Sequence, residues 1–230
     1  MKKILILIVA LLSLGTTAYS ARPHLTPTSP YQHGQRWFFS VQGGPKIGLY
    51  DHIGSFFDNG RGWSAVTYHG ALAVGYNFSD AWSLRVSGGY SRNAGACTPY
   101  QGEFYPYTYN AAYAFADGIL DYPALCEINK AFNTKFYAGL GGAYTFGFSD
   151  PEHPFEVLNT NNFVPALRLG VILEYCFPSG FGLFSDIALE NFLDRYDGYA
   201  TGTAIALDSA LKISFGVIWH FKNSKIRTLY

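Results

Sequence analysis

The residues most able to do chemistry in this sequence are charged side chains that recur at alternate positions within apolar segments. Successive side chains of a β-strand point to opposite faces, so these charges share the polar faces of their strands. The set comprises Lys46, Arg85, Arg168, Glu174, Asp186, Glu190, Asp208 and Lys212, together with His69. Acids and bases on an enclosed face could pass protons or ions, or could neutralise one another. Because buried charges must be paired, we favour a structural network of ion pairs.

The three cysteines indicate no metal site and no disulfide framework. Cys97, Cys126 and Cys176 are an odd number at irregular spacing, and no zinc-ligand spacing or phosphate-binding loop accompanies them. We therefore predict no catalytic, cofactor-binding or metal-binding residue. A bridge between Cys126 and Cys176 is a conceivable alternative to free thiols.

The charge balance argues against one class of partner, and the N-terminus indicates the compartment. The chain has 16 Lys and Arg against 16 Asp and Glu, which argues against a nucleic-acid partner because such a partner needs a basic stripe. Lys2 and Lys3 precede an apolar run over 4–14, and Ala18-Tyr19-Ser20 places small residues before a cleavage point. This pattern is typical of a secretory signal peptide over 1–20.

Eight segments after residue 35 alternate apolar and polar residues and predict eight β-strands. Their approximate ranges are 36–50, 65–78, 82–91, 105–122, 135–148, 163–177, 181–193 and 207–221. No run of eighteen apolar residues follows the signal, whereas strands of about ten to fifteen residues can cross a bilayer when tilted. The predicted fold is all-β: an eight-stranded antiparallel up-and-down transmembrane β-barrel, a meander, over 36–221. The proline-containing segment 21–35 is predicted to be a flexible leader.

The fourth segment is the least regular. Its aromatic residues alternate up to position 115, the phase breaks at Asp117, and Leu120 and Tyr122 continue on the opposite parity. A β-bulge near Ala116 would restore the pattern, since one inserted residue swaps the faces. The tyrosines at the start of the segment suit a recognition surface or an interfacial belt, and we favour the belt. These tyrosines are Tyr105, Tyr107 and Tyr109.

The connections between the segments set the direction of the barrel. Long connections over 51–64, 92–104, 149–162 and 194–205 alternate with short ones at 79–81 and 179–180 and a longer one over 123–134. Outer-membrane barrels have short periplasmic turns and long outer loops, so both termini are predicted to be periplasmic. Outward aromatic residues near the strand ends, Trp219, Phe221, Phe146 and Phe148 among them, predict girdles at both lipid interfaces.

A lipid-modifying enzyme on the same scaffold is the main alternative. A lipid A deacylase type would join a Ser, a His and an acidic residue on the lipid-facing surface. The outward polar residues late in the chain are Ser185, Asn191 and Ser209, with no outward His among them. A palmitoyltransferase type would use a loop His such as His52, near Asp51 and Ser55. Because a catalytic role requires a defined geometry, we predict that the protein is not an enzyme; a narrow pore is a further alternative.

The final run Gly216-Val217-Ile218-Trp219-His220-Phe221 is similar to the terminal signal of small outer-membrane barrels. On this run and the strand pattern, the chain resembles the OmpA/OmpX-like eight-stranded family, including stand-alone barrel-domain proteins related to PorT. The resemblance implies the cell outer membrane of a Gram-negative organism, contact with lipid and lipopolysaccharide, and recognition of Trp219 and Phe221 by the barrel assembly machinery. The family usually stops at its final Phe, whereas 222–230 continue here as an expected periplasmic tail.

The resemblance transfers no single function, because members serve adhesion, envelope integrity and secretion support. We expect a non-enzymatic barrel with a packed polar lumen. It would act in envelope integrity, or bind a surface ligand or envelope protein partner through its four long outer loops.

Overall fold

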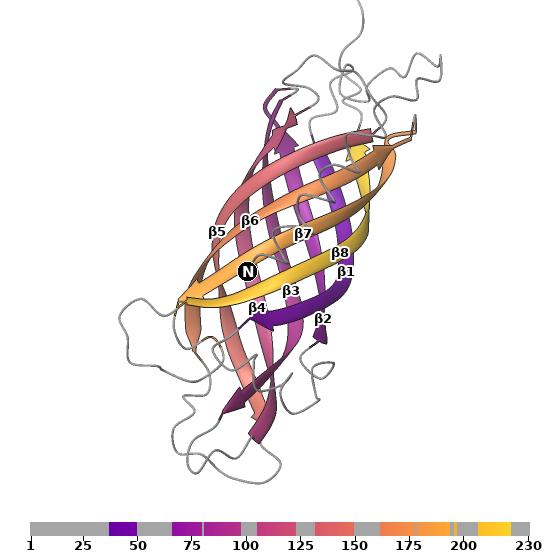
Figure 1. Ribbon diagram of the computed structural model, residues 1–230. Coiled ribbons are helices and arrows are strands. Elements are labelled where there is room, and N and C mark those ends of the chain that lie inside the picture. Colours follow the sequence, from indigo (N-terminus) through magenta and orange to yellow (C-terminus); the bar gives the residue numbers. More distant parts are fainter. Residues whose placement is uncertain are drawn as a thin grey trace, which may run out of the picture.

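Alternation of apolar and polar residues produces eight strands, which the computed structural model closes into a barrel (Figure 1). The strands are β1 Trp37–Leu49, β2 Val66–Asn77, β3 Trp82–Cys97, β4 Tyr105–Asp121, β5 Phe132–Ser149, β6 Phe163–Cys176, β7 Phe181–Leu193 and β8 Leu207–Phe221. The structure describes residues 37–49, 66–79, 81–97, 105–122, 132–149, 162–177, 179–193, 196 and 207–221. The predicted signal peptide, leader and C-terminal tail lie outside these ranges, as does most of each long loop.

Each strand pairs antiparallel with its neighbours in the sequence, and β1 also pairs with β8 to complete the wall. The β1–β8 ladder runs from Trp37 opposite Phe221 to Leu49 opposite Ser209. The prediction of an all-β, antiparallel up-and-down barrel is therefore confirmed. Among the described residues, no helix is long and apolar enough to cross a membrane.

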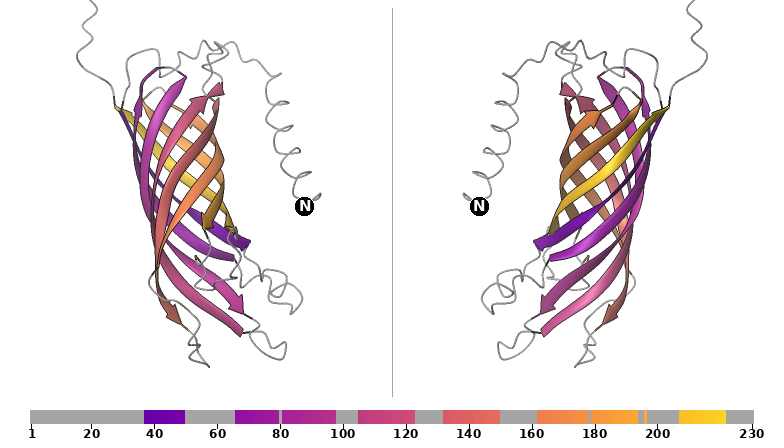
Figure 2. Two further views of the ribbon diagram at one scale, coloured as in Figure 1. Left: turned by 90° about the vertical axis from the view of Figure 1, so that its left-hand side faces the viewer. Right: turned by 90° about the vertical axis from the view of Figure 1, so that its right-hand side faces the viewer.

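The strands differ in length around the barrel. β3, β4 and β5 have 16, 17 and 18 residues, whereas β1, β2 and β7 have 13, 12 and 13. The three long strands project beyond the others at one end, which is the lower end in Figure 1, and the two side views of Figure 2 show the same uneven rim. β3 continues to Cys97 rather than stopping at Ser91 as predicted, and β5 begins at Phe132 rather than Lys135.

The fourth strand differs from the prediction in two ways: which of its side chains face the lumen, and where its pairing is irregular. The β3–β4 ladder is continuous from Trp82 opposite Leu120 to Cys97 opposite Tyr105, so no bulge lies at Ala116. The register shift against β5 falls instead between Thr108 and Asn110. With no bulge at Ala116, one face of β4 stays inside throughout its described length. That face carries Tyr107, Tyr109, Tyr113, Phe115, Asp117 and Ile119, all buried.

The interfacial-belt interpretation is consequently wrong for Tyr107 and Tyr109, and the side chain of Tyr105 lies outside the described residues. The outward positions in the middle of β4 are small ones, Ala112, Ala114, Ala116 and Gly118. Phe148 was also predicted to face outward, but its ring stacks on Tyr109 with centroids 4.8 Å apart. The positive φ of 63° at Gly147, a conformation that favours glycine, precedes this change of direction. Side chains fill the lumen of an eight-stranded barrel, and here large rings do so.

Candidate functional site

The polar interior of the barrel is the part of the molecule that gathers reactive groups. Five Lys and Arg side chains and six carboxylates are buried there among the described residues, with His69 and His220. They form three clusters along the lumen, which we call the central, outer and periplasmic clusters after the direction predicted from the sequence. Because acids and bases are nearly equal in number, the charges can neutralise one another within the lumen.

The central cluster is built around Asp117 of β4. Arg168 of β6 donates from Nε to Asp117 Oδ1 at 2.6 Å and from Nη2 to Oδ2 at 2.5 Å. Arg85 of β3 donates from Nε to Oδ2 of the same carboxylate at 2.7 Å. Its Nη1 lies 3.6 Å from Asp186 Oδ2, and the Tyr137 hydroxyl donates to Asp186 Oδ1 at 2.7 Å. Two guanidinium groups and two carboxylates are thus joined in one charge-assisted network.

The outer cluster surrounds Glu190 of β7. Lys46 Nζ lies 3.1 Å from Glu190 Oε2, and Lys212 Nζ lies 3.3 Å from Oε1. Lys46 also donates to the Tyr196 hydroxyl at 2.8 Å, and Tyr196 stacks on Phe192 with centroids 3.6 Å apart. The backbone N–H of Tyr196 donates to Asp208 Oδ2 at 2.8 Å. This cluster places paired charges and rings in the half of the lumen toward the C-terminal ends of β1 and β7.

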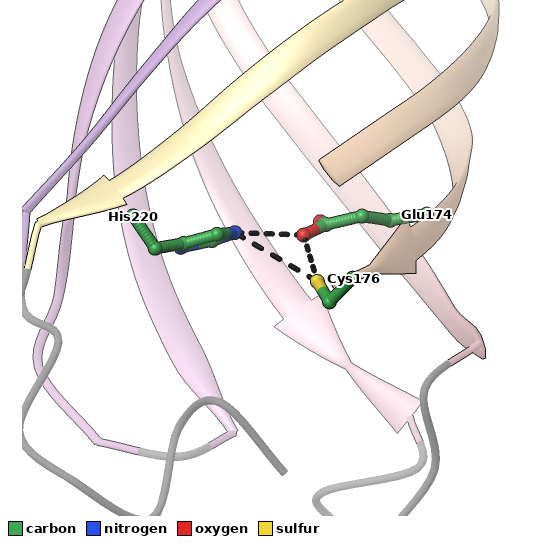
Figure 3. A group of neighbouring side chains, drawn as sticks. All are labelled: Glu174, Cys176 and His220. Carbon is green, nitrogen blue, oxygen red and sulfur yellow. Dashed lines mark hydrogen bonds and ion pairs between the residues drawn. The ribbon is translucent and has the colours of Figure 1, made fainter. Parts of the chain in front are cut away.

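The periplasmic cluster lies at the end of the lumen where β6 and β8 finish (Figure 3). Glu174 Oε1 accepts from the Cys176 thiol at 2.7 Å and lies 2.7 Å from His220 Nε2. Cys176 Sγ lies 4.0 Å from the same His nitrogen. The other carboxylate oxygen of Glu174 accepts from Lys135 Nζ at 2.5 Å. Glu174, Cys176 and His220 therefore present a carboxylate oxygen, a sulfur and an imidazole nitrogen to one point, the donor types that bind transition metals.

Every charged residue that the sequence analysis placed in the lumen is buried in the structure. In the β6–β7 ladder Arg168 is directly opposite Glu190. The guanidinium nevertheless binds Asp117 rather than Glu190.

Sequence reasoning missed Asp117, Lys135 and Tyr196 as members of these clusters. The pattern indicated a break in phase at Asp117, whereas this residue continues the inward face of β4. Lys135 stood at the predicted edge of its strand. Tyr196 follows β7 in a loop, and no strand pattern could place it. The approach of His220 on β8 to Cys176, two strands away on β6, had no signal in the sequence.

The residues that a lipid-modifying enzyme would need are not brought together in the described part of the chain. Ser209 donates to Asn191 Oδ1 at 2.9 Å on the wall between β7 and β8. His69 lies inside, with Nε2 2.9 Å from Ser214 Oγ, and is 4% exposed. The loop group around His52 and the cysteine Cys126 lie outside the described residues.

No protein-family model and no curated protein matches the sequence. Solved structures match in shape. A major outer membrane protein from Thermus thermophilus has a TM-score of 0.51 at 14% identity, covering 80% of this chain and 99% of that chain. Neisserial surface protein A (NspA) gives 0.49 at 13% identity, covering 80% and 97%. Ail, the attachment invasion locus protein of Yersinia pestis, solved with the heparin analogue sucrose octasulfate, gives 0.45 at 14%, covering 81% and 99%. The Thermus match shows that the barrel described here is also the fold of a solved outer-membrane protein.

Proposed function

We propose that this chain is a non-enzymatic barrel of the bacterial outer membrane, with both termini in the periplasm. It would contribute to envelope integrity or bind a surface ligand or an envelope protein through its outer loops. The observation that carries the proposal is the inverted distribution of side chains, with an apolar exterior around a paired, charged interior.

The exterior has the character of a lipid-facing surface. At mid-barrel Leu140, Leu169 and Phe215 are 66%, 58% and 64% exposed. A monomeric soluble protein rarely leaves such a continuous apolar surface in water. The backbone of a closed barrel is satisfied by its ladders and leaves no open edge, as a membrane-spanning structure requires.

Aromatic residues gather at the strand ends, as expected at lipid interfaces. At one end Trp37 packs against Tyr76 with centroids 4.9 Å apart, and Phe181 packs against Trp219 at 5.9 Å. At the other end Tyr90 lies 6.4 Å from Phe146. The first end also holds the tight turns, in which Phe78 N–H donates to Trp82 O and Phe177 N–H to Phe181 O. Short turns mark the periplasmic side, which supports periplasmic termini.

The packing of the interior favours a structural role for the lumen and argues against a pore. The three clusters pair acids with bases along the lumen, and a small cavity between Arg85 and Glu174 has a volume of about 20 Å³, room for roughly one water molecule. A filled lumen leaves the outer loops as the surface available to a ligand or partner. Trp219 and Phe221 are 56% and 52% exposed on β8, which supports contact with lipid and recognition by the barrel assembly machinery.

Cell fractionation, heat modifiability on unboiled gels and protease treatment of intact cells test the proposal together. We expect a band in the outer membrane that shifts on boiling and is cleaved from outside only within the four predicted outer loops. Planar bilayers with purified protein should show no stable conductance. Lipid A mass spectra should be the same with and without the protein. A soluble protein, a stable open channel or an altered acyl pattern would each overturn the proposal.

A further inference from the structure

The periplasmic cluster contains three different metal-binding side chains in contact with one another. Glu174 Oε1, Cys176 Sγ and His220 Nε2 all lie within 4.8 Å of one another. The three residues are 1%, 4% and 2% exposed. Figure 3 shows the three side chains converging on one point from β6 and β8. Such a group is more specific than a set of acidic residues, because sulfur, nitrogen and oxygen donors converge in one buried place.

The local fold explains why the donors can meet. Glu174 and Cys176 are two residues apart on β6 and therefore share its inward face. β7 lies between β6 and β8, and its residue opposite both Cys176 and Ile218 is Gly182. A Cβ at Gly182 would come within 2.8 Å of the Ile218 side chain and 3.0 Å of Tyr175 O. The missing side chain at this position leaves the space in which the end of β8 approaches the end of β6.

We propose that Glu174, Cys176 and His220 form a binding site for a borderline-soft divalent cation, with Zn²⁺ as the best match, at the periplasmic end of the lumen. Zn²⁺ binds Cys sulfur at about 2.3 Å, His nitrogen at about 2.0–2.1 Å and carboxylate oxygen at about 2.0–2.2 Å. Donors around a tetrahedral ion at those distances stand about 3.5 Å apart. The donor separations of 2.7, 2.7 and 4.0 Å are each within about an ångström of that value.

The charge of the site suits a divalent ion. His220 must be neutral to bind a metal. In that form of the cluster, Asp121 and Glu174 carry two negative charges and Lys135, which is opposite Asp121 in the β4–β5 ladder, carries one positive charge. When Zn²⁺ binds, the Cys176 S–H bond breaks, a sulfur–zinc bond forms and the proton leaves to solvent. The ion and the new thiolate then bring the cluster to zero net charge, and a neutral cluster is much less costly to bury than an isolated ion. Water completes the fourth position.

Cobalt provides a spectroscopic test with the mature full-length protein in detergent micelles. Cys97→Ser and Cys126→Ser are introduced together, so that Cys176 is the only thiol. After treatment with EDTA, one equivalent of Co²⁺ should produce a thiolate-to-cobalt charge-transfer band and the visible bands of a four-coordinate site. Excess Zn²⁺ should abolish both. A folded protein of this background that shows no charge-transfer band overturns the proposal.

Single variants in the same background assign the ligands. Cys176→Ser should eliminate the charge-transfer band, and His220→Gln should weaken cobalt affinity at least about tenfold. His69→Gln is the matched control, because His69 is also buried but bonds Ser214 elsewhere in the lumen; its affinity should be unchanged. If Cys176→Ser does not fold, the ligands are assigned instead from the effect of Zn²⁺ on the urea midpoint of the background protein and of His220→Gln. Zn²⁺ should raise it in the background protein and much less in His220→Gln, and an equal rise in both would contradict the assignment.

Discussion

Arg168 and Asp117 bind one another across Gly139, which is opposite both of them in the β4–β5 and β5–β6 ladders. Both oxygens of the carboxylate accept from the guanidinium, at 2.6 and 2.5 Å. The pair therefore ties two strands that share no ladder, over a residue that has no side chain to separate them. Arg168 is 1% exposed and Asp117 is 0% exposed, so the interaction lies outside the reach of bulk water.

Replacing Arg168 with alanine should destabilise the barrel by about 3–5 kcal/mol, because it removes one partner of a buried ion pair. Asp117 and Asp186 would then share only Arg85 as a cationic partner in this cluster. Urea titration in lipid vesicles, followed by the fraction of the heat-modifiable band, measures the loss. Arg92→Ala, at an exposed position of β3, is the control and should change stability by less than about 0.5 kcal/mol. A variant with the wild-type midpoint would show that the pair is not stabilising.

Gly139→Ala tests the space between the same two residues. An added Cβ would lie 2.1 Å from Asp117 Oδ1, so the carboxylate would have to leave its present position. We expect a loss of about 1–3 kcal/mol, the usual range for overpacking. Gly118→Ala provides a matched comparison one position along the chain from Asp117, where a Cβ would meet nothing within 4 Å. Equal urea midpoints for the two variants would argue against the close approach at Gly139.

Leu169→Arg tests whether the exposed face is in contact with lipid. Leu169 is 58% exposed near the middle of β6, and an arginine at the bilayer midplane costs about 2–4 kcal/mol. Leu193→Arg, at the C-terminal end of β7, should cost only about 0–1 kcal/mol. Folding yields and urea midpoints in vesicles distinguish the two. Similar costs at both depths would be inconsistent with a membrane-embedded exterior.

Tyr196→Phe isolates the contribution of one hydroxyl to the outer cluster. The hydroxyl accepts from Lys46 at 2.8 Å, and a hydrogen bond to a charged group contributes about 1.5–3 kcal/mol. We expect a loss in that range, measured by the same urea titration. Tyr144→Phe, at a position 46% exposed on β5, should leave the midpoint nearly unchanged. A Tyr196→Phe variant as stable as the wild type would mean that water replaces the lost acceptor.

Most of the architecture could be predicted because strand alternation is a local property of the sequence. β7 and β8 run from Phe181 to Leu193 and from Leu207 to Phe221, as predicted. The prediction for β4 was wrong because its large residues were assigned to the lipid-facing side by analogy with the other strands. Hydrophobic size does not report the face when rings such as Tyr113 fill the lumen and alanines face outward.

The side-chain clusters could be predicted only in part, because they depend on how far the closed wall is sheared. The inward position of Glu174 follows from parity, but its contact with His220 depends on the stagger accumulated across β7. The Arg168–Asp117 contact likewise requires Gly139 to lie between them, and the sequence shows a glycine there without showing its neighbours. Contacts across the lumen are therefore a property of the closed barrel rather than of any segment.

The pairing of β1 with β8 has a consequence for how the molecule is made. Trp37–Leu49 is the first strand to be synthesised, yet one of its edges finds its partner only in Leu207–Phe221. Without that last segment the sheet would have two open edges, whose N–H and C=O groups cannot be left unsatisfied in hydrocarbon. A chain truncated before residue 207 would therefore lack the strand that closes the wall against β1, and we expect it not to form this barrel.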